Sequence, residues 1–464
     1  MVIRQPAQWV SISLEDILKS KDLRLEASVY VTKAAQATQT VLKNRYGVVP
    51  LSNLIADCFY PNRFKRQYVG KGAAFFMPSQ MSEINPEPYK FISLNNIKNP
   101  DELYVTKGTL LITRSGTIGK VALVTQSLEN GLFSDDIIRV KTHKEEDLSY
   151  LYVYFKHQIG NSVIQAANYG SVIQHIEPEH LLQLPIPNAP QSLKNQIHQK
   201  IIRSFALRDE SNRLLQQAQD LLQKKLQLPP LDAFKHQSRQ PETWSVSVED
   251  LAGRFEAAYH NPVVHRIEAH LQKHAKQVST LADKSLVSEI SLPARFKRHY
   301  VEPEFGIPFL GGKEILELDP RGDKYLSKKQ HKDLIENQLL LQENMILITC
   351  SGTIGKTVLV PKHWQGWAAS QHLLRVQPVN DDMAGYLAVW LKSPWALPLI
   401  QRHTYGSVIF EIDQYHLSEV TVPILDNATM KQINALALQA NALRTQAFME
   451  EQEALAMFEN IFQD

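Results

Sequence analysis

The sequence predicts an α+β protein with two duplicated, mixed α/β domains separated by two long antiparallel helices, which form a coiled-coil-like spacer. Three observations predict this fold class. The hexapeptide Ser-Gly-Thr-Ile-Gly-Lys occupies 115–120 and returns unchanged 236 positions later, at 351–356. Other motifs repeat in the same order. Each half of the chain also ends in a long run of apolar residues at helical spacing.

The repeat has the length of a domain. Four further motifs recur in order, residues 9–17 at 244–251, 24–27 at 254–257, 63–69 at 295–301 and 169–173 at 405–409. Solenoid repeats run to roughly 20–50 residues, so this repeat indicates a duplicated domain. The Pro-containing polar stretch 229–242 is typical of a linker. The predicted organisation is a first domain at 1–188, a first long helix at 189–230, a linker at 231–243, a second domain at 244–425 and a second long helix at 426–464.

The repeated hexapeptide is predicted to be a tight turn between two strands, because β-branched and Leu residues flank its glycines. A phosphate-binding loop is the competing interpretation. It fails because Arg114 and Cys350 stand where the first glycine of that motif belongs, and Val121 stands where one copy needs Ser or Thr. A turn does not require Lys120 or Lys356, so both lysines remain candidates for a binding role.

The long helices are predicted at 191–228 and 428–462. Apolar stripes define them: Ile197, Ile201, Phe205, Leu214, Ala218, Leu221 and Leu222 in the first, and Ile433, Leu436, Ala440, Leu443, Ala447, Ala454, Met457 and Ile461 in the second, with Glu450 interrupting. Each helix either packs on its own domain or pairs with the other. Pairing is favoured, because a free helix of this length would expose a large apolar surface. Shorter amphipathic helices are predicted at 147–161 and 382–394.

Composition excludes several classes of protein. The 464 residues are 44% hydrophobic and 21% charged, as in a globular protein, and the net charge of +2 means that any basic surface is local. Two cysteines, Cys58 and Cys350, cannot make a disulfide framework or an all-cysteine zinc site. The first 13 residues lack the apolar core of a signal peptide, and no run of 18 apolar residues occurs. These features predict a cytoplasmic protein without a membrane span.

No catalytic motif is recognisable. The sequence has no Gly-x-Gly-x-x-Gly after a strand, no His-Glu-x-x-His and no Gly-x-Ser-x-Gly. The loop 85–89 resembles the Asn-Pro-Pro-Tyr loop of amino-methyltransferases, but Glu87 splits its prolines. His403 and His416 are interpreted as solvated surface histidines. We therefore predict no catalytic residue, no cofactor and no metal site.

Basic clusters are the clearest binding feature. The Arg-Phe-Lys-Arg motifs at 63–66 and 295–298 each place three cations and one aromatic ring in four residues, which suits two contacts with a polyanion. The alternative is a solvated charge cluster with Phe64 and Phe296 in the core. The Tyr-Gly-Ser motifs at 169–171 and 405–407 are either small phosphate donors or ordinary turns.

The order and duplication of these motifs resemble the specificity subunit of Type I restriction–modification systems, a plan shared by the specificity subunits of Type IIB enzymes. The resemblance covers essentially the whole chain. It implies two target-recognition domains joined by antiparallel conserved helices, with double-stranded DNA as ligand. It also implies methyltransferase subunits bound on either side of the helices, and endonuclease or translocase subunits as further partners. The chain itself is then non-catalytic, because base methylation needs base flipping and a cofactor site.

Two similar domains on one spacer should read a bipartite, asymmetric site. Identical blocks suit backbone contacts and divergent blocks suit base contacts. The predicted backbone-binding residues are Arg63, Lys65, Arg66, Arg114, Ser115, Lys120, Tyr169, Ser171, Arg295, Lys297, Arg298, Ser351, Lys356, Tyr405 and Ser407. The base-reading candidates are Ser79, Gln80, Asp135, Asp136, Lys313, Glu314, Gln371 and His372. The alternative is that the divergent blocks are only variable loops.

Two other functions compete with this interpretation. One is a nucleic-acid-binding enzyme with a degenerate motif, which binding of S-adenosylmethionine or ATP by the isolated chain would favour. The other is a coiled-coil scaffold without sequence-specific DNA binding, which would retard no duplex even with its partner present.

Overall fold

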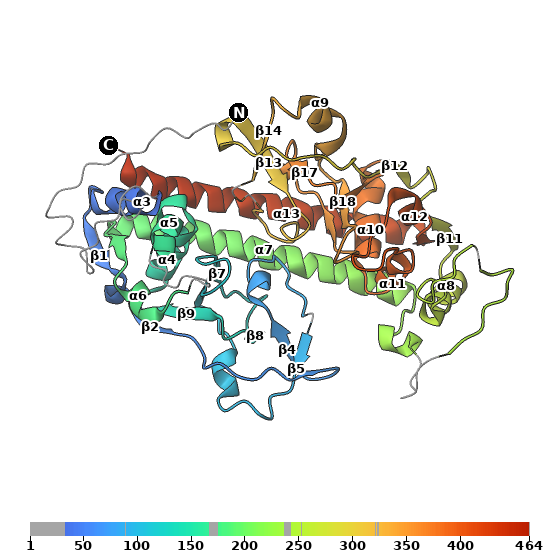
Figure 1. The fold of residues 1–464 in the computed structure, drawn as a ribbon, viewed down its shortest axis with the longest axis horizontal. Helices are drawn as coiled ribbons and strands as arrows, with labels where there is room; N and C mark the ends of the chain where they lie inside the picture. Colours follow the sequence, from blue (N-terminus) through green and yellow to red (C-terminus); the bar gives the residue numbers. More distant parts are fainter. Residues whose placement is uncertain are drawn as a thin grey trace. The chain divides into compact units, whose positions relative to one another are not determined.

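The computed structural model describes residues 33–88, 90–166, 175–235, 243–251, 253–320, 322 and 324–463 (Figure 1). The chain forms two compact units. Unit 1 contains residues up to 209 together with 449–464, and unit 2 contains 210–448. Both long helices therefore begin in one unit and end in the other.

Unit 1 is built on two sheets with an apolar core on each side of the first. The first sheet has the order β2-β9-β6-β7, from β2 (Ile55–Phe59), β9 (Ile137–Thr142), β6 (Leu110–Thr113) and β7 (Val121–Leu123), all antiparallel. The second has the order β3-β5-β4-β8, from β3 (Tyr68–Val69), β5 (Lys90–Ile92), β4 (Ala73–Phe76) and β8 (Leu132–Phe133). Strand β1 (Val48–Pro50) pairs with β10 (Pro185–Pro187).

Alternation along β6 decides which core each side chain enters. Leu110 and Ile112 face the helices of the unit, whereas Leu111 faces a separate cluster with Phe133 and Ile137. Successive side chains of a strand point to opposite faces, so the three consecutive apolar residues of β6 are buried on both sides of the sheet. Besides the two long helices, the described residues of unit 1 form α3 (Lys33–Leu42), α4 (Glu145–Lys156), α5 (Gln158–Ala166) and α6 (Pro178–Leu182).

Unit 2 repeats this plan. One sheet has the order β12-β18-β15-β16, from β12 (Val287–Ser291), β18 (Leu373–Pro378), β15 (Ile346–Thr349) and β16 (Thr357–Leu359). Another has the order β14-β13-β17, from β14 (Tyr325–Ser327), β13 (Gly306–Leu310) and β17 (Ala368–Ala369). Strand β11 (Gln277–Thr280) pairs with β19 (Thr421–Ile424). The helices are α8 (Pro262–His274), α9 (Lys332–Leu334), α10 (Asp381–Lys392), α11 (Ala396–Gln401) and α12 (Gln414–Ser418).

The long helices are α7 (Gln191–Lys225) and α13 (Asn427–Glu459). In unit 1 the two helices run antiparallel. Lys200 forms a salt bridge with Glu453, and Arg208, later in α7, forms one with Glu451, which is earlier in α13. The start of α7 and the end of α13 share one core, with Ile197 and Ile201 beside Ala454, Phe458 and Ile461. In unit 2 the end of α7 and the start of α13 share another, with Ala218 and Leu222 beside Met430, Ile433 and Ala437. The predicted pairing of the helices is confirmed.

Two details of the helix prediction are wrong. The buried acidic residue of α13 is Glu451, not the predicted interruption Glu450, and Leu436, Leu443 and Met457 are only half-buried. Part of the predicted linker is also ordered against unit 2. Residues Leu231–Phe234 form a 3₁₀ turn, η4, and the Phe234 side chain is buried.

A buried ion cluster lies where α13 meets α4 and α7 in unit 1. The Glu451 carboxylate is fully buried and bonds Lys156 and Arg208, and it accepts a hydrogen bond of 3.0 Å from the Tyr152 hydroxyl. Burial alone would raise the pKa of Glu451, but the charges of Lys156 and Arg208 lower it to about 2. The cluster therefore depends on an ionised carboxylate.

Replacement of this carboxylate is expected to destabilise unit 1. Glu451→Gln removes the buried counter-charge of two half-buried cations, Lys156 and Arg208, which costs on the order of 3–5 kcal/mol. The matched control is Glu453→Gln on the same helix, because the Glu453 side chain is half exposed and its pair with Lys200 is screened by water. Thermal unfolding should show a large drop in Tm for Glu451→Gln and little change for the control. If Glu451→Gln and Glu453→Gln have equal Tm values, the ion cluster does not stabilise unit 1.

Comparison of the wild type with Glu451→Gln also tests how the stability of unit 1 depends on pH. The pKa of Glu451 lies below its ordinary value of 4.5 in the folded chain, so its stabilisation is complete above about pH 4.5 and is lost as the pH falls toward about 2. The difference in Tm between wild type and Glu451→Gln should shrink over that range. A difference that stays constant would show that the carboxylate is not ionised.

Candidate nucleic-acid interface

The repeated hexapeptide forms the hairpin turn between β6 and β7 and between β15 and β16, as predicted. The Thr113 hydroxyl accepts a hydrogen bond of 3.0 Å from the Lys120 amide, and Thr349 makes the same bond with Lys356. Both glycines of each turn have positive φ angles. A Cβ atom on Gly119 would lie 2.5 Å from the Ile164 side chain, so the turn packs closely on α5. The repeated glycines are explained by these positive φ angles and, at Gly119 and Gly355, by close packing as well.

A three-residue loop precedes β9 in unit 1 and β18 in unit 2. We call these stretches, 134–136 and 370–372, the reading loops. The Ser134 amide donates a hydrogen bond of 3.2 Å to the Phe76 carbonyl, and the Ser134 hydroxyl accepts one of 3.2 Å from the Asp136 amide. The Ser370 amide bonds the Leu310 carbonyl at 2.8 Å, and its hydroxyl accepts the His372 amide at 3.0 Å. The two domains therefore hold the same loop in the same way.

The last arginine of each basic cluster contacts the middle residue of the reading loop. Arg66 Nη2 lies 2.8 Å from Asp135 Oδ1 and stacks over the Phe75 ring at 5.5 Å. Arg298 Nη2 lies 3.0 Å from Gln371 Oε1 and stacks over the Phe309 ring at 5.4 Å.

The preceding aromatic residues pack edge-on against the same rings. The centroids of Phe64 and Phe75 are 6.3 Å apart, and those of Phe296 and Phe309 are 6.2 Å apart. Phe64 and Phe296 therefore pack against the cores, as the alternative interpretation of the basic clusters predicted. Arg66 and Arg298 nevertheless reach the reading loops.

What the loops present differs between the domains. Unit 1 offers Asp136, whereas the Asp135 side chain is buried against Arg66. Unit 2 offers Gln371 and His372, both half-buried. Burial, together with the charge of Arg298, lowers the pKa of His372, so this ring is neutral at neutral pH. The loops are thus acidic in one domain and uncharged in the other.

Four further predicted base-reading residues lie before the loops in sequence. In unit 2, Lys313 and Glu314 line a cavity of about 240 Å³, and the two candidate stretches meet there. Its other lining residues are Arg298, Tyr300, Phe309, Gly311, Gly312, Lys324, Ser370 and His372. In unit 1, Ser79 is exposed, but Gln80 is fully buried and its amide bonds the Met77 amide and the Glu87 carbonyl. Gln80 holds the local turn, and we leave it out of the proposed reading set.

The predicted backbone-binding residues separate into two groups. Arg63, Lys65 and Lys297 are exposed, as are Tyr405 and Ser407. Ser115, Lys120, Ser351 and Lys356 are half-buried around the hairpin turns. Arg295 is exposed but bonds both oxygens of Glu411, at 2.8 and 3.0 Å. Tyr169 and Ser171 lie outside the described residues.

Arg114 does not fit the predicted role. Its guanidinium is buried, bonds Glu177 and stacks over the Tyr60 ring at 4.2 Å. It also lies 3.8 Å from Asp136. The side chain therefore supports the reading loop of unit 1 from inside, and we do not propose it as a phosphate contact.

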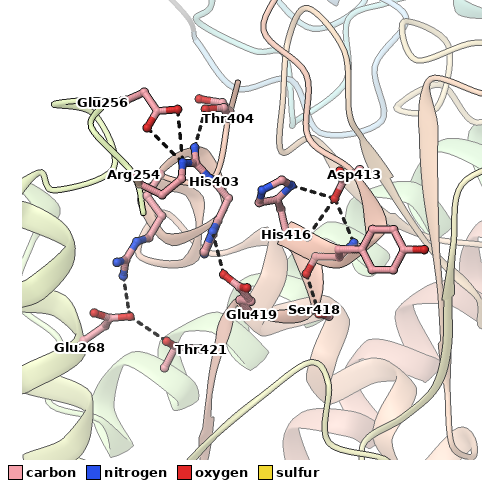
Figure 2. Close-up of polar contacts among 12 residues, drawn as sticks. Arg254, Glu256, Glu268, His403, Thr404, Asp413, His416, Ser418, Glu419 and Thr421 are labelled. Carbon is pink, nitrogen blue, oxygen red and sulfur yellow. Dashed lines mark hydrogen bonds and ion pairs between the residues drawn. The ribbon is translucent and has the colours of Figure 1, made fainter. Parts of the chain in front are cut away.

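The interpretation of His403 as a solvated histidine is wrong. Its ring is buried against Tyr259, and burial, together with the charge of Arg402, lowers its pKa to about 3. Figure 2 shows His403 directed at Glu419, 3.5 Å away, and His416 directed at Asp413, 2.8 Å away. Arg254, from a repeated motif, reaches the Thr404 carbonyl at 3.4 Å beside them. This network holds the base of the Tyr-Gly-Ser loop in unit 2.

Metal and thiol chemistry find no support in the residues described. No group of three or more His, Cys, Asp and Glu side chains in the described ranges is placed to hold a metal ion. Burial, followed by the charge of Asp57 or Glu411, raises the pKa of Cys58 and Cys350 to about 12, so neither is a thiolate at neutral pH. Among the helices that the structure describes, none is long and apolar enough to cross a membrane.

Sequence reasoning missed two buried arginines beneath the reading loops, Arg139 in β9 and Arg375 in β18. They stand 236 positions apart, each at the third position of a strand and between apolar neighbours. A charge repeated at the same position of two buried strands was the signal that would have identified them.

Comparison with known proteins gives one family. The model of the Type I restriction modification DNA specificity domain matches twice, at residues 69–219 and 300–438. A search of curated proteins finds no match. The fold comparison includes the Type I restriction–modification S subunit of M. genitalium, at 14% identity and a TM-score of 0.30, covering 91% of this chain and 96% of that one. It also includes the HsdS subunit of Thermoanaerobacter tengcongensis, at 12% identity and a TM-score of 0.27, covering 90% and 96%.

The family model carries the assignment, because it matches more than half of the chain and finds one copy in each half. One match falls in each half of the chain, and each match includes part of a long helix. The chain therefore belongs to the family of Type I restriction–modification DNA specificity proteins, and its role is in DNA sequence specificity.

Proposed function

We propose that this chain reads a bipartite, asymmetric double-stranded DNA site, with one half-site read by each domain, and that it presents this site to methyltransferase subunits. Restriction subunits would join the same complex. The chain itself would be non-catalytic, and the chemistry on the base would belong to its partners. This function places the protein in the cytoplasm, where its DNA substrate lies.

One observation carries the proposal. The two reading loops have the same backbone bonds and the same arginine beside them, but their side chains differ. One loop presents Asp136 beside the buried Asp135, and the other presents Gln371 and His372. A carboxylate can accept a hydrogen bond from cytosine N4, whereas a glutamine amide suits adenine. A shared scaffold with different reading groups is what an asymmetric site requires.

The exposed cations beside the loops suit the DNA backbone. Arg63 and Lys65 in unit 1 and Lys297 in unit 2 are exposed next to the arginine of each reading loop. Phosphate contacts position a protein on the duplex without reading sequence. Each basic cluster therefore divides into phosphate-binding cations and one arginine that orients a reading group.

The long helices are the proposed docking site for the methyltransferase subunits. Each carries an exposed apolar side chain in unit 1, Ile202 on α7 and Met449 on α13, each 51% exposed. Exposed apolar groups on an otherwise polar helix surface are favourable contacts for a partner.

The basic cluster of unit 1 should separate into two effects. Arg63→Ala with Lys65→Ala is expected to weaken binding to all duplexes and to lower the salt slope by about 2, because two phosphate contacts are lost. Arg66→Ala is expected to relax preference at one half-site, because Asp135 loses its partner. Filter binding at several salt concentrations measures both. If the double variant keeps the wild-type slope, these cations do not contact phosphate.

The two-reader model is tested by Gln371→Ala with His372→Ala in the complex with methyltransferase subunits. The expected result is altered methylation at one half-site only, since a lost base contact costs about 1–3 kcal/mol at that position. Genome-wide mapping of methylated bases gives the readout. Simultaneous change of both half-sites would contradict the model, and absence of any sequence preference in the wild-type complex would contradict the proposed function itself.

Partner docking is tested by Ile202→Asp. The exposed side chain should tolerate the change in the isolated chain, but an unpaired carboxylate buried in a subunit interface costs several kcal/mol. Co-purification with the methyltransferase subunit should fall while Tm stays constant. Gln199→Asp, at an exposed polar position of the same helix, is the control and should co-purify as wild type does. Unchanged co-purification of Ile202→Asp would place the docking site elsewhere.

A further inference from the structure

Each reading loop lies over a buried arginine that bonds both of its ends. Arg139 Nη1 donates to the Ile137 carbonyl at 2.7 Å, and its Nη2 donates to the Phe133 carbonyl at 3.2 Å. Phe133 and Ile137 are the residues immediately before and after the loop 134–136. The arginine therefore joins the last residue of β8 to the first residue of β9.

The second domain has the same arrangement. Arg375 Nη1 donates to the Leu373 carbonyl at 2.9 Å, and its Nη2 donates to the Ala369 carbonyl at 2.6 Å. Each arginine also reaches one more carbonyl, that of Leu103 at 3.2 Å or that of Leu339 at 3.5 Å. The bonding pattern is thus duplicated with the domain.

These arginines are costly elements of an apolar core. Arg139 is 2% exposed and Arg375 is 3% exposed, and no ion pair is recorded for either in the part of the chain that the structure describes. In both, the Nε atom has no hydrogen-bond partner among those residues. An apolar side chain would fill the same space without the desolvation of a charge. Their presence in both domains therefore calls for a role that packing does not supply.

The carbonyl bonds supply such a role. A guanidinium presents several donors in a rigid plane, so it can hold two carbonyl groups at a set separation, which a single ammonium cannot do. Burial lowers the pKa of both arginines to about 10, so both stay charged at neutral pH. The hydroxyls of Ser134 and Ser370 and the guanidinium groups of Arg66 and Arg298 complete the support of each loop from above.

Base readout depends on this support. A bidentate contact with a base edge is directional, and a shift of about 1 Å in the supporting shell is enough to lose it. Phosphate contacts by exposed lysines and arginines tolerate such a shift, because charge attraction is not directional.

We propose that Arg139 and Arg375 are positioning residues for sequence recognition, each holding one reading loop in the geometry that reads one half-site. This inference rests on the proposed function. It predicts a loss of specificity confined to the half-site of the changed domain, with non-specific DNA affinity and the salt slope unchanged.

The experiment uses the full chain in complex with its methyltransferase subunits. Arg139→Met and Arg375→Met keep the side-chain volume and remove the donors. Two quantities are measured: the ratio of affinities for the target duplex and an unrelated duplex, and the methylated sequence across the genome. The ratio should fall by at least about tenfold in each variant, which corresponds to one lost base contact. Arg139→Met should relax one half-site, and Arg375→Met should relax the other.

Arg444→Met is the matched control for lost stability. Arg444 is likewise buried, and burial lowers its pKa to about 10, but it lies on α13 and not under a reading loop. Its replacement should leave the affinity ratio unchanged, whichever way Tm moves. Arg375→Lys keeps the positive charge but replaces the planar guanidinium by a single ammonium group. This variant is used if Arg375→Met does not fold. It should relax the same half-site as Arg375→Met.

Three outcomes would overturn the inference while the wild-type complex still shows a defined bipartite site. These are an equal loss of affinity for all duplexes, relaxation of both half-sites by one variant, and full specificity in Arg375→Lys. Failure of the proposed function is a different result, in which the wild-type complex itself has no sequence preference.

Discussion

The first domain completes its core with the end of the chain. Helix α3 and the strand–helix layers of unit 1 leave an apolar surface that the start of α7 covers only in part, and Ala454, Phe458 and Ile461 of α13 fill the rest. Phe458 alone contacts the rings of Tyr150, Tyr154 and His157. Because large apolar surfaces must be buried, unit 1 cannot reach its folded state before residues 449–464 have been made. The second unit, formed from one continuous segment, has no such dependence.

The two copies of the domain are identical at some positions and differ at others, for physical reasons. The hairpin turn leaves no room for a side chain at Gly119 or Gly355, so its sequence is held by packing. The reading loops are held by backbone bonds, by the serine at their first position and by arginines outside the loop. The same support therefore accepts different side chains at the second and third positions. A domain built this way can change what it presents without changing its core. That freedom is the property expected of a protein whose role is in DNA sequence specificity.

Much of the fold could be predicted from the sequence because its signals are local. Strand–turn–strand at the hexapeptide, the two long helices and their duplication follow from periodicity and repetition. The errors concern residues whose environment is set by distant segments. In the sequence alone Glu451 resembles an exposed residue of a helix, because its partners Lys156 and Arg208 are far away in the chain. His403 resembles a solvated histidine for the same reason, because the ring that packs on it belongs to Tyr259. Gln80 and Arg114 were chosen for their chemistry, but their burial depends on tertiary contacts that spacing does not reveal.

The buried carboxylate also makes the two halves unequal as building blocks. Arg208 and Arg444 occupy equivalent positions of the repeat, but the counterpart of Glu451 is Leu215. Arg208 has its carboxylate, whereas no ion pair is recorded for Arg444 in the described residues. The second half thus carries both members of an arginine–glutamate pair, and the first half carries only the arginine. Two copies of the second half, joined in place of the natural pair, could satisfy both arginines, whereas two copies of the first half would satisfy neither. The Glu451 side chain therefore determines which arrangement of two repeats gives every buried arginine of this pair a carboxylate partner.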